Sequence, residues 1–102
     1  MIFRLRLFEE AAEEVEHERH WYRQRSESAE ASFLRELDQA IAVVLEAPHI
    51  WPQYMAGTRR YIFPKFPFSL IYFVEDDVVL IVSVTAENKD PGYWRDRMQK
   101  RR

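Results

Sequence analysis

The chain has 102 residues, a length that allows one small hydrophobic core, and we predict a single domain over residues 1–102. Its hydrophobic fraction of 47% excludes an intrinsically disordered protein, and the absence of cysteine excludes disulfides and thiolate metal sites. A net charge of −2 argues against a general nucleic-acid binder, because phosphate neutralisation needs a positive field.

Charge divides the chain into an acidic and a basic half. Residues 1–50 hold 6 Lys and Arg against 11 Asp and Glu, a balance of −5, and residues 51–102 hold 9 against 6, a balance of +3. Any contact with RNA or DNA is therefore expected in the second half. No apolar run approaches the roughly 18 residues that cross a bilayer. We expect a cytoplasmic protein with no membrane partner.

The first half predicts one strand and two helices. Residues 2–7, IFRLRL, alternate apolar and basic side chains, which is typical of a short edge strand. Residues 9–25 have helical spacing with an acidic first turn. Hydroxyls at residues 26–28 are predicted to cap a second helix that ends before Pro48. The short connection between the helices predicts an antiparallel hairpin.

The second half predicts three strands, at residues 59–63, 68–74 and 78–84, after an irregular connection rich in proline. With Asp76 and Asp77 as a two-residue turn, Val74 pairs with Val79 and the register continues to Ile71 with Val82. The complete expectation is an α+β fold. It has an N-terminal edge strand, an antiparallel two-helix hairpin and a three-stranded antiparallel meander.

This register divides the last two strands into two faces. The face predicted to pack on the helices is almost wholly aliphatic and consists of Ile71, Phe73, Leu80, Val82 and Val84. The opposite face is apolar too, but carries the hydroxyls of Tyr72, Ser83 and Thr85. That face needs a cover. Two covers stay open: a protein partner, or the C-terminal residues YWRDRM folding back over the sheet.

Metal and cofactor chemistry finds little support in the sequence. Glu13 with His17, and Glu16 with His20, are spaced as i,i+4 pairs that suit zinc geometrically, but no third ligand clusters with them. The two glycines, Gly57 and Gly92, exclude a glycine-rich phosphate loop. We therefore predict no metal and no cofactor.

The order of elements, together with particular residues, resembles the RelE/ParE superfamily of toxins from type II toxin–antitoxin modules. The residues that carry the resemblance are Phe33, Ala40-Ile41, Pro48, GTRRY (57–61), FPFSLIY (66–72), the strand 78–84 and DPGYWRDR (90–97). The pattern is most similar to the ParE side and to plasmid stabilisation proteins. It implies a toxin neutralised by a cognate antitoxin that wraps it, as a homo-oligomer or as a hetero-oligomer with the antitoxin.

Three functions follow from the resemblance. A ParE-like toxin binds and inhibits DNA gyrase without acting as an enzyme, and this is the leading expectation. A RelE-like toxin cleaves messenger RNA on the ribosome. The third reading is a toxin-like fold that has lost its activity and survives as a binding module.

The RNA-cleaving alternative assigns catalysis to four residues of the basic half. Cleavage needs cations at the scissile phosphate and a group that manages the 2′-hydroxyl proton; the candidates are Arg60, Lys65, Lys89 and Tyr93. Arg60 is equally readable as a structural arginine paired with an acidic helix residue. Relatives often have a histidine and a basic run where this chain has Ala86 and Asn88. That departure weakens the RNase interpretation and leaves open altered or lost toxicity.

A second set of residues is expected to bind the protein partner. It lies on the hydroxyl-bearing sheet face and in the C-terminal segment, and consists of Tyr72, Ser83, Thr85, Trp94 and Arg95. Tyr72 is also readable as a core residue with its hydroxyl at the rim. Trp94 is more simply a hydrophobic plug that closes the sheet.

Overall fold

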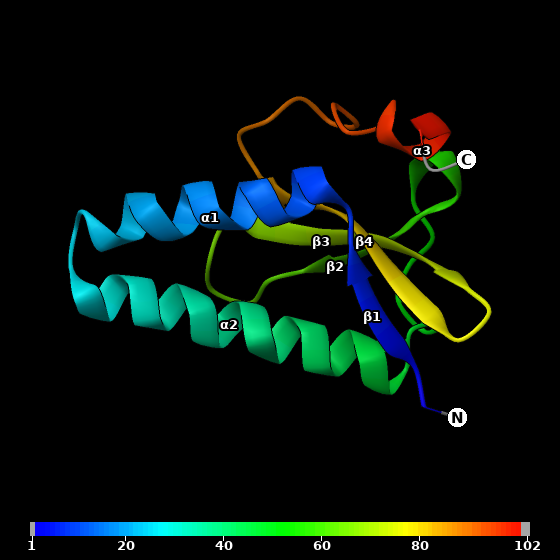
Figure 1. The fold of residues 1–102 in the computed structure, drawn as a ribbon, viewed down its shortest axis with the longest axis horizontal. Helices are drawn as coiled ribbons and strands as arrows, with labels where there is room; N and C mark the ends of the chain where they lie inside the picture. The colour runs from blue at the N-terminus through cyan, green and yellow to red at the C-terminus, as the bar shows by residue number, and fades with distance from the viewer. Residues whose placement is uncertain (1, 101–102) are drawn as a thin grey trace.

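A computed structural model describes residues 2–100 (Figure 1). Its single sheet has the strand order β1-β4-β3-β2, with bounds β1 (Arg4–Leu7), β2 (Arg59–Ile62), β3 (Phe68–Glu75) and β4 (Val78–Ala86). The predicted meander is confirmed, because β2, β3 and β4 pair antiparallel. The predicted edge strand is also confirmed: β1 lies at the edge of the sheet, parallel to β4.

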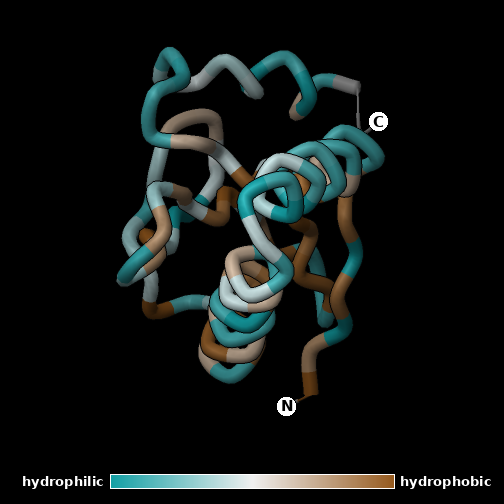
Figure 2. Tube along the Cα trace, turned by 90° about the vertical axis from the view of Figure 1, so that its left-hand side faces the viewer, coloured by the Kyte–Doolittle hydropathy of each residue, from teal (hydrophilic) through white to brown (hydrophobic). Residues whose placement is uncertain are grey.

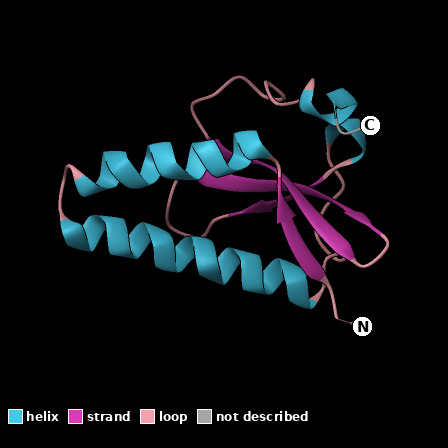
Figure 3. Cartoon of the chain, viewed as in Figure 1, coloured by secondary structure: helices cyan, strands magenta, loops and turns pink. Residues whose placement is uncertain are grey.

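Two long antiparallel helices, α1 (Glu9–Arg23) and α2 (Glu27–Glu46), lie side by side on one face of the sheet (Figures 1 and 3). The predicted cap is confirmed, because the backbone N–H of Ala29 donates to Ser26 Oγ at 3.0 Å. A short 3-10 turn, η1 (Met55–Gly57), precedes β2, and a last turn, α3 (Arg97–Lys100), ends the described chain.

A buried carboxylate joins the two helices near their connection. The Glu30 side chain is 9% exposed and accepts hydrogen bonds from Arg19 at 2.6 Å and from Arg23 at 3.0 Å. Both arginines belong to α1 and Glu30 to the first turn of α2. These charge-assisted bonds tie the last turns of α1 to the first turn of α2, beside the aromatic contacts of Tyr22 with Phe33 and Phe68.

The predicted assignment of the two sheet faces is wrong. The face that packs on the helices carries Leu70, Tyr72, Val79 and Ile81, in one cluster with Phe33 and other residues of α2. The aliphatic set Ile71, Phe73 and Val82 lies on the opposite face, in a second cluster around Trp94. Polar atoms on the helix-packed face do not prevent burial when they find a partner.

A β-bulge adds a second departure from the prediction, beyond the part of β4 where the two faces are already exchanged. The predicted pairs Val74–Val79, Phe73–Leu80 and Tyr72–Ile81 are confirmed, but the register shifts between Ile71 and Tyr72, so that Ile71 pairs with Ser83. One extra residue in β4 moves the remainder of that strand to the other face. Val84 therefore joins the helix-packed core, and Ser83 shares a face with Ile71.

Tyr72 illustrates how the core accepts a phenol. Its side chain has no exposed surface, and its hydroxyl donates to the Pro48 carbonyl oxygen at 2.6 Å. Burial raises the pKa of Tyr72 to about 12 from the ordinary value of 10.0.

This shift predicts a loss of stability at alkaline pH. The folded state holds the Tyr72 proton more tightly than the unfolded state, so this contribution is intact below pH 10 and is lost as pH rises toward about 12. We expect an ultraviolet phenolate titration of the wild type to contain a step near pH 12 that Tyr72→Phe lacks. Identical titration curves for the two proteins would contradict the assignment.

Candidate functional site

The C-terminal segment covers the sheet face that the helices leave open. Trp94 is 1% exposed and packs on Ile71, Phe73 and Val82, with Met55 and Met98 at the margin of the cluster. The prediction that Trp94 plugs the sheet is confirmed, although on the face opposite to the expected one. In Figure 1 the orange segment after β4 arches over α1 and the sheet before it reaches α3.

Gly92 allows the chain to turn directly before this plug. Its φ is +78°, and a Cβ at this position would lie 2.6 Å from Arg95 Cδ and 2.7 Å from Met55 Sδ. Only glycine combines this left-handed backbone with so close an approach. The sequence DPGYW is thus a turn and a plug.

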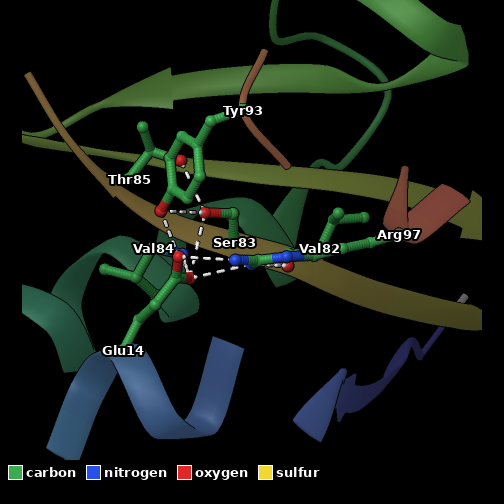
Figure 4. Close-up of polar contacts among 7 residues, drawn as sticks. All are labelled: Glu14, Val82, Ser83, Val84, Thr85, Tyr93 and Arg97. Carbon is green, nitrogen blue, oxygen red and sulfur yellow. Dashed lines mark hydrogen bonds and ion pairs between the residues drawn. The ribbon is translucent and has the colours of Figure 1, made fainter. Parts of the chain in front are cut away.

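The carboxylate of Glu14, on α1, anchors the segment (Figure 4). It accepts hydrogen bonds from the Tyr93 hydroxyl, from Ser83 Oγ at 3.0 Å and from two Arg97 nitrogens at 3.0 and 3.1 Å. The ion pair is largely removed from water, since the Glu14 and Arg97 side chains are 18% and 14% exposed. Charge-assisted bonds of this kind are stronger than neutral ones.

Glu14 and Arg97 also hydrogen-bond to the backbone of β4 where β1 ends. Pairing between β1 and β4 ends at Ile81, which leaves the next backbone groups of β4 without a strand partner on that side. There the Val84 N–H donates to Glu14 Oε1 at 3.1 Å, and Arg97 donates to the Val82 carbonyl oxygen at 3.0 Å. Side chains thereby satisfy backbone groups that would otherwise lack partners.

The network also fixes the protonation of Tyr93. Burial, followed by the hydrogen bond to Glu14, raises the pKa of Tyr93 above its ordinary value. The phenol therefore stays protonated at neutral pH and donates a hydrogen bond to Glu14. Arg97 remains charged, because the pairing with Glu14 raises its pKa despite the opposing effect of burial.

A small pocket of about 150 Å³ lies on the same sheet face, beside Trp94. Among the residues that line it are Arg60, Thr85, Lys89 and Trp94, so the structure brings four of the predicted site residues together. We call it the Arg60 pocket. The lining holds two cations against one carboxylate, that of Glu87, so its net positive charge suits an anionic group such as a carboxylate or a phosphate.

Aromatic rings hold Arg60 at this pocket. Its guanidinium lies 4.4 Å from the ring centroid of Tyr54, and that ring lies 6.1 Å from Trp94. Within residues 2–100 no acidic side chain forms an ion pair with Arg60, so the predicted pairing with a helix carboxylate is wrong. A cation stacked on a ring keeps its outer hydrogen-bonding edge available for a ligand.

The other predicted residues lie apart from the Arg60 pocket. Lys65 is exposed in the loop before β3, where its backbone N–H donates to Glu36 on α2 at 2.9 Å. Tyr72 is inside the helix-packed core and offers no surface to a partner. Arg95 is exposed beside Gly92, and Tyr93 and Ser83 belong to the Glu14 network.

Sequence reasoning missed two residues that organise this region. Glu14 is one of six glutamates between residues 9 and 18, and no spacing rule distinguishes it from its neighbours. Tyr54 lies in the irregular connection, where no period assigns it a face. Only the tertiary structure shows that both contact the C-terminal half.

The described residues offer neither a metal-binding cluster nor a membrane-spanning helix. Over residues 2–100, no three His, Asp or Glu side chains are grouped to hold a metal ion. No helix in that range is both long enough and apolar enough to cross a membrane.

Several solved structures have a similar fold. A chain of the chromosomal ParDE toxin–antitoxin system from P. aeruginosa matches with a TM-score of 0.71 at 13% identity, over 83% of this chain and 96% of that chain. A mutant of the E. coli toxin RelE in the free state matches with a TM-score of 0.63 at 22% identity, over 99% and 98%. The isolated E. coli RelE toxin matches with a TM-score of 0.57 at 21% identity, over 98% and 99%. This chain has the RelE/ParE toxin fold.

The family follows from the sequence. A family model described as the ParE toxin of the type II toxin–antitoxin system parDE matches residues 5–91. The chain belongs to this ParE toxin family. No curated protein matches it by sequence.

Proposed function

We propose that this chain is a cytoplasmic toxin that inhibits DNA gyrase by binding it and is neutralised by a cognate antitoxin. Membership of the ParE toxin family supports the toxin role and the antitoxin partner. Inhibition of gyrase is the further step, and it assigns the protein a binding function instead of catalysis.

One observation carries the choice of binding over RNA cleavage: the four candidate catalytic residues do not form one site. Arg60 and Lys89 line one pocket, but Lys65 lies in another part of the surface with Arg35 and Glu36. The Tyr93 hydroxyl donates to Glu14, and burial together with this bond raises its pKa. A proton-transfer group needs a pKa near the working pH and access to the substrate.

A gyrase supercoiling assay tests this proposal. Purified protein at micromolar concentration is expected to inhibit supercoiling of relaxed plasmid, and prior addition of the antitoxin is expected to restore it. Heat-denatured protein serves as the control for non-specific effects. Full supercoiling activity in the presence of excess folded protein would contradict the proposal.

A second candidate function is ribosome-dependent cleavage of messenger RNA, which the Arg60 pocket favours. Arg60 and Lys89 there could hold a phosphate, and Thr85 adds a hydroxyl. In this case Arg60→Ala should reduce cleavage by roughly 100-fold or more, since it removes charge stabilisation from the transition state.

The matched control for that measurement is Arg35→Ala, which removes an exposed arginine outside the Arg60 pocket. Translating ribosomes programmed with a defined messenger provide the assay. An uncut messenger with the wild-type protein would end this alternative. If neither gyrase inhibition nor cleavage occurs and overexpression is harmless, the third reading, a toxin-like binding module, is favoured.

A further inference from the structure

A second hollow, on the other side of the end of β4, is not used by the functions above. It has a volume of about 450 Å³ and lies between α1, the start of β3 and the end of β4. Its apolar lining comes from Trp21, Tyr22, Pro67 and Phe68, and its charged lining includes Glu18 and Glu87. We call it the Trp21 groove.

The carboxylates of the groove are not neutralised within the chain. Over residues 2–100, the Glu18 and Glu87 side chains form neither an ion pair nor a hydrogen bond. Lys89 also lines the groove, but its ammonium lies 5.9 Å from the ring centroid of Tyr93, toward the C-terminal segment. Charge complementarity therefore favours a cationic ligand and disfavours nucleic acid or an acidic peptide.

Besides the two carboxylates, the exposed indole ring of Trp21 can contact such a cation. Trp21 is 42% exposed, which is unusual for so large an apolar side chain in a small protein. The guanidinium of Arg25, which does not line the groove, lies 3.8 Å from its ring centroid, so a ligand cation would contact the part of the indole that faces the groove. Tyr22 supports the ring from the side, with the two ring centroids 4.9 Å apart at 88°.

We propose that the Trp21 groove binds an arginine or lysine side chain of the antitoxin, flanked in the antitoxin by apolar residues. The cation would lie against Trp21 and pair with Glu18 or Glu87, and the flanking residues would contact Pro67 and Tyr22. This inference rests on the antitoxin partnership of the proposed function. To that partnership it adds the chemical class of one antitoxin side chain, a cation, and its binding position, the Trp21 groove.

The location suits a segment that wraps the toxin. The Trp21 groove and the Arg60 pocket share Ala86, Glu87 and Lys89, so they adjoin across the end of β4. An extended antitoxin segment anchored in the groove can continue into the pocket without leaving the surface. Figure 2 shows α1 as mainly hydrophilic, so the aromatic groove is a local apolar site on a polar helix.

Affinity for the cognate antitoxin, measured by calorimetry, tests the proposal. Glu18→Lys and Trp21→Ala are each expected to weaken binding by roughly tenfold or more, because they oppose or remove the partner of the cation. Glu13→Lys is the matched control: it makes the same charge change at an exposed glutamate of α1 outside the groove. Its affinity should stay within about twofold of the wild type.

The outcomes separate this inference from the proposed function. If the wild type binds the antitoxin and all three variants bind equally well, the groove is not the anchor and the inference is overturned, while the toxin assignment stands. If the wild type does not bind the antitoxin, the proposed partnership itself fails. Circular dichroism of each variant checks that the fold is intact.

A matched peptide pair tests the chemistry of the groove without the antitoxin. Two capped hexapeptides, Ala-Val-Arg-Val-Ser-Ala and Ala-Val-Glu-Val-Ser-Ala, differ only in the sign of one charge. The arginine peptide should shift the Trp21 indole N–H resonance in NMR titrations, with an affinity roughly tenfold above that of the glutamate peptide. Equal shifts, or none with either peptide, would contradict the proposal.

Discussion

Replacing Trp94 with alanine is expected to lower the free energy of unfolding by about 3–5 kcal/mol. Trp94 is 1% exposed and is the largest member of the cluster that covers Ile71, Phe73 and Val82. Its removal leaves a cavity and exposes the second face of the sheet to water. Guanidinium chloride denaturation, followed by circular dichroism, measures the change.

The chain contains its own control for this substitution. Trp21→Ala removes the same side chain from a position that is 42% exposed, and should cost about 1 kcal/mol or less. Similar losses of stability for the two variants would contradict the description of Trp94 as the plug of the second face.

Replacing Glu14 with alanine is expected to cause the second large loss of stability. It leaves the mostly buried Arg97 charge, the Ser83 and Tyr93 hydroxyls and the Val84 N–H without their shared acceptor. Removing one partner of a buried pair costs about 3–5 kcal/mol. Partial exposure of both side chains places our expectation at the lower end, about 3 kcal/mol.

A double-mutant cycle isolates this pair from the remaining contacts of Glu14. Arg97→Met alone should be destabilising, and in the Glu14→Gln background it should cost about 1 kcal/mol less, because the charge pair is then absent. Glu13→Ala, an exposed position on the same helix, should change stability by about 0.5 kcal/mol or less. Additive effects of the two substitutions would contradict a coupled network.

Local patterns predicted most of the fold. The amphipathic stripe of α2, the Ser26 cap, the Asp76-Asp77 turn and the edge position of β1 depend on near neighbours in the sequence, and all are confirmed. The assignment of faces failed for a specific reason. Both faces are apolar, and the choice between them depended on the hydroxyls of one face, whereas the bulge in β4 moves only the residues after Val82 to the other side.

Burial of Tyr72 shows a second limit of prediction from the sequence pattern. The phenol was grounds for placing its face outside the core, but the Pro48 carbonyl, 24 residues away in the chain, satisfies its hydroxyl. A sequence pattern contains no signal for such a remote acceptor. For the same reason the sequence could not distinguish Glu14 from the other glutamates of α1, since its partners lie about 70 to 80 residues away.

The candidate site was predicted in part. The basic second half does supply Arg60 and Lys89 to one pocket, and Thr85 and Trp94 line it too. Lys65 failed to join them, because two backbone N–H groups of its loop, those of Lys65 and Phe66, donate to Glu36 on α2 and fix the loop there. The Trp21 groove draws part of its lining from α1, in the acidic first half, where no partner-binding residue was predicted.

Direct binding to purified DNA gyrase, measured by calorimetry with and without the antitoxin, tests the central claim that this toxin acts by binding. We predict a one-site isotherm with micromolar or tighter affinity, and loss of the binding heat when the toxin is first saturated with antitoxin. The absence of any binding heat at tens of micromolar toxin, together with cleavage of messenger RNA on translating ribosomes, would contradict the claim.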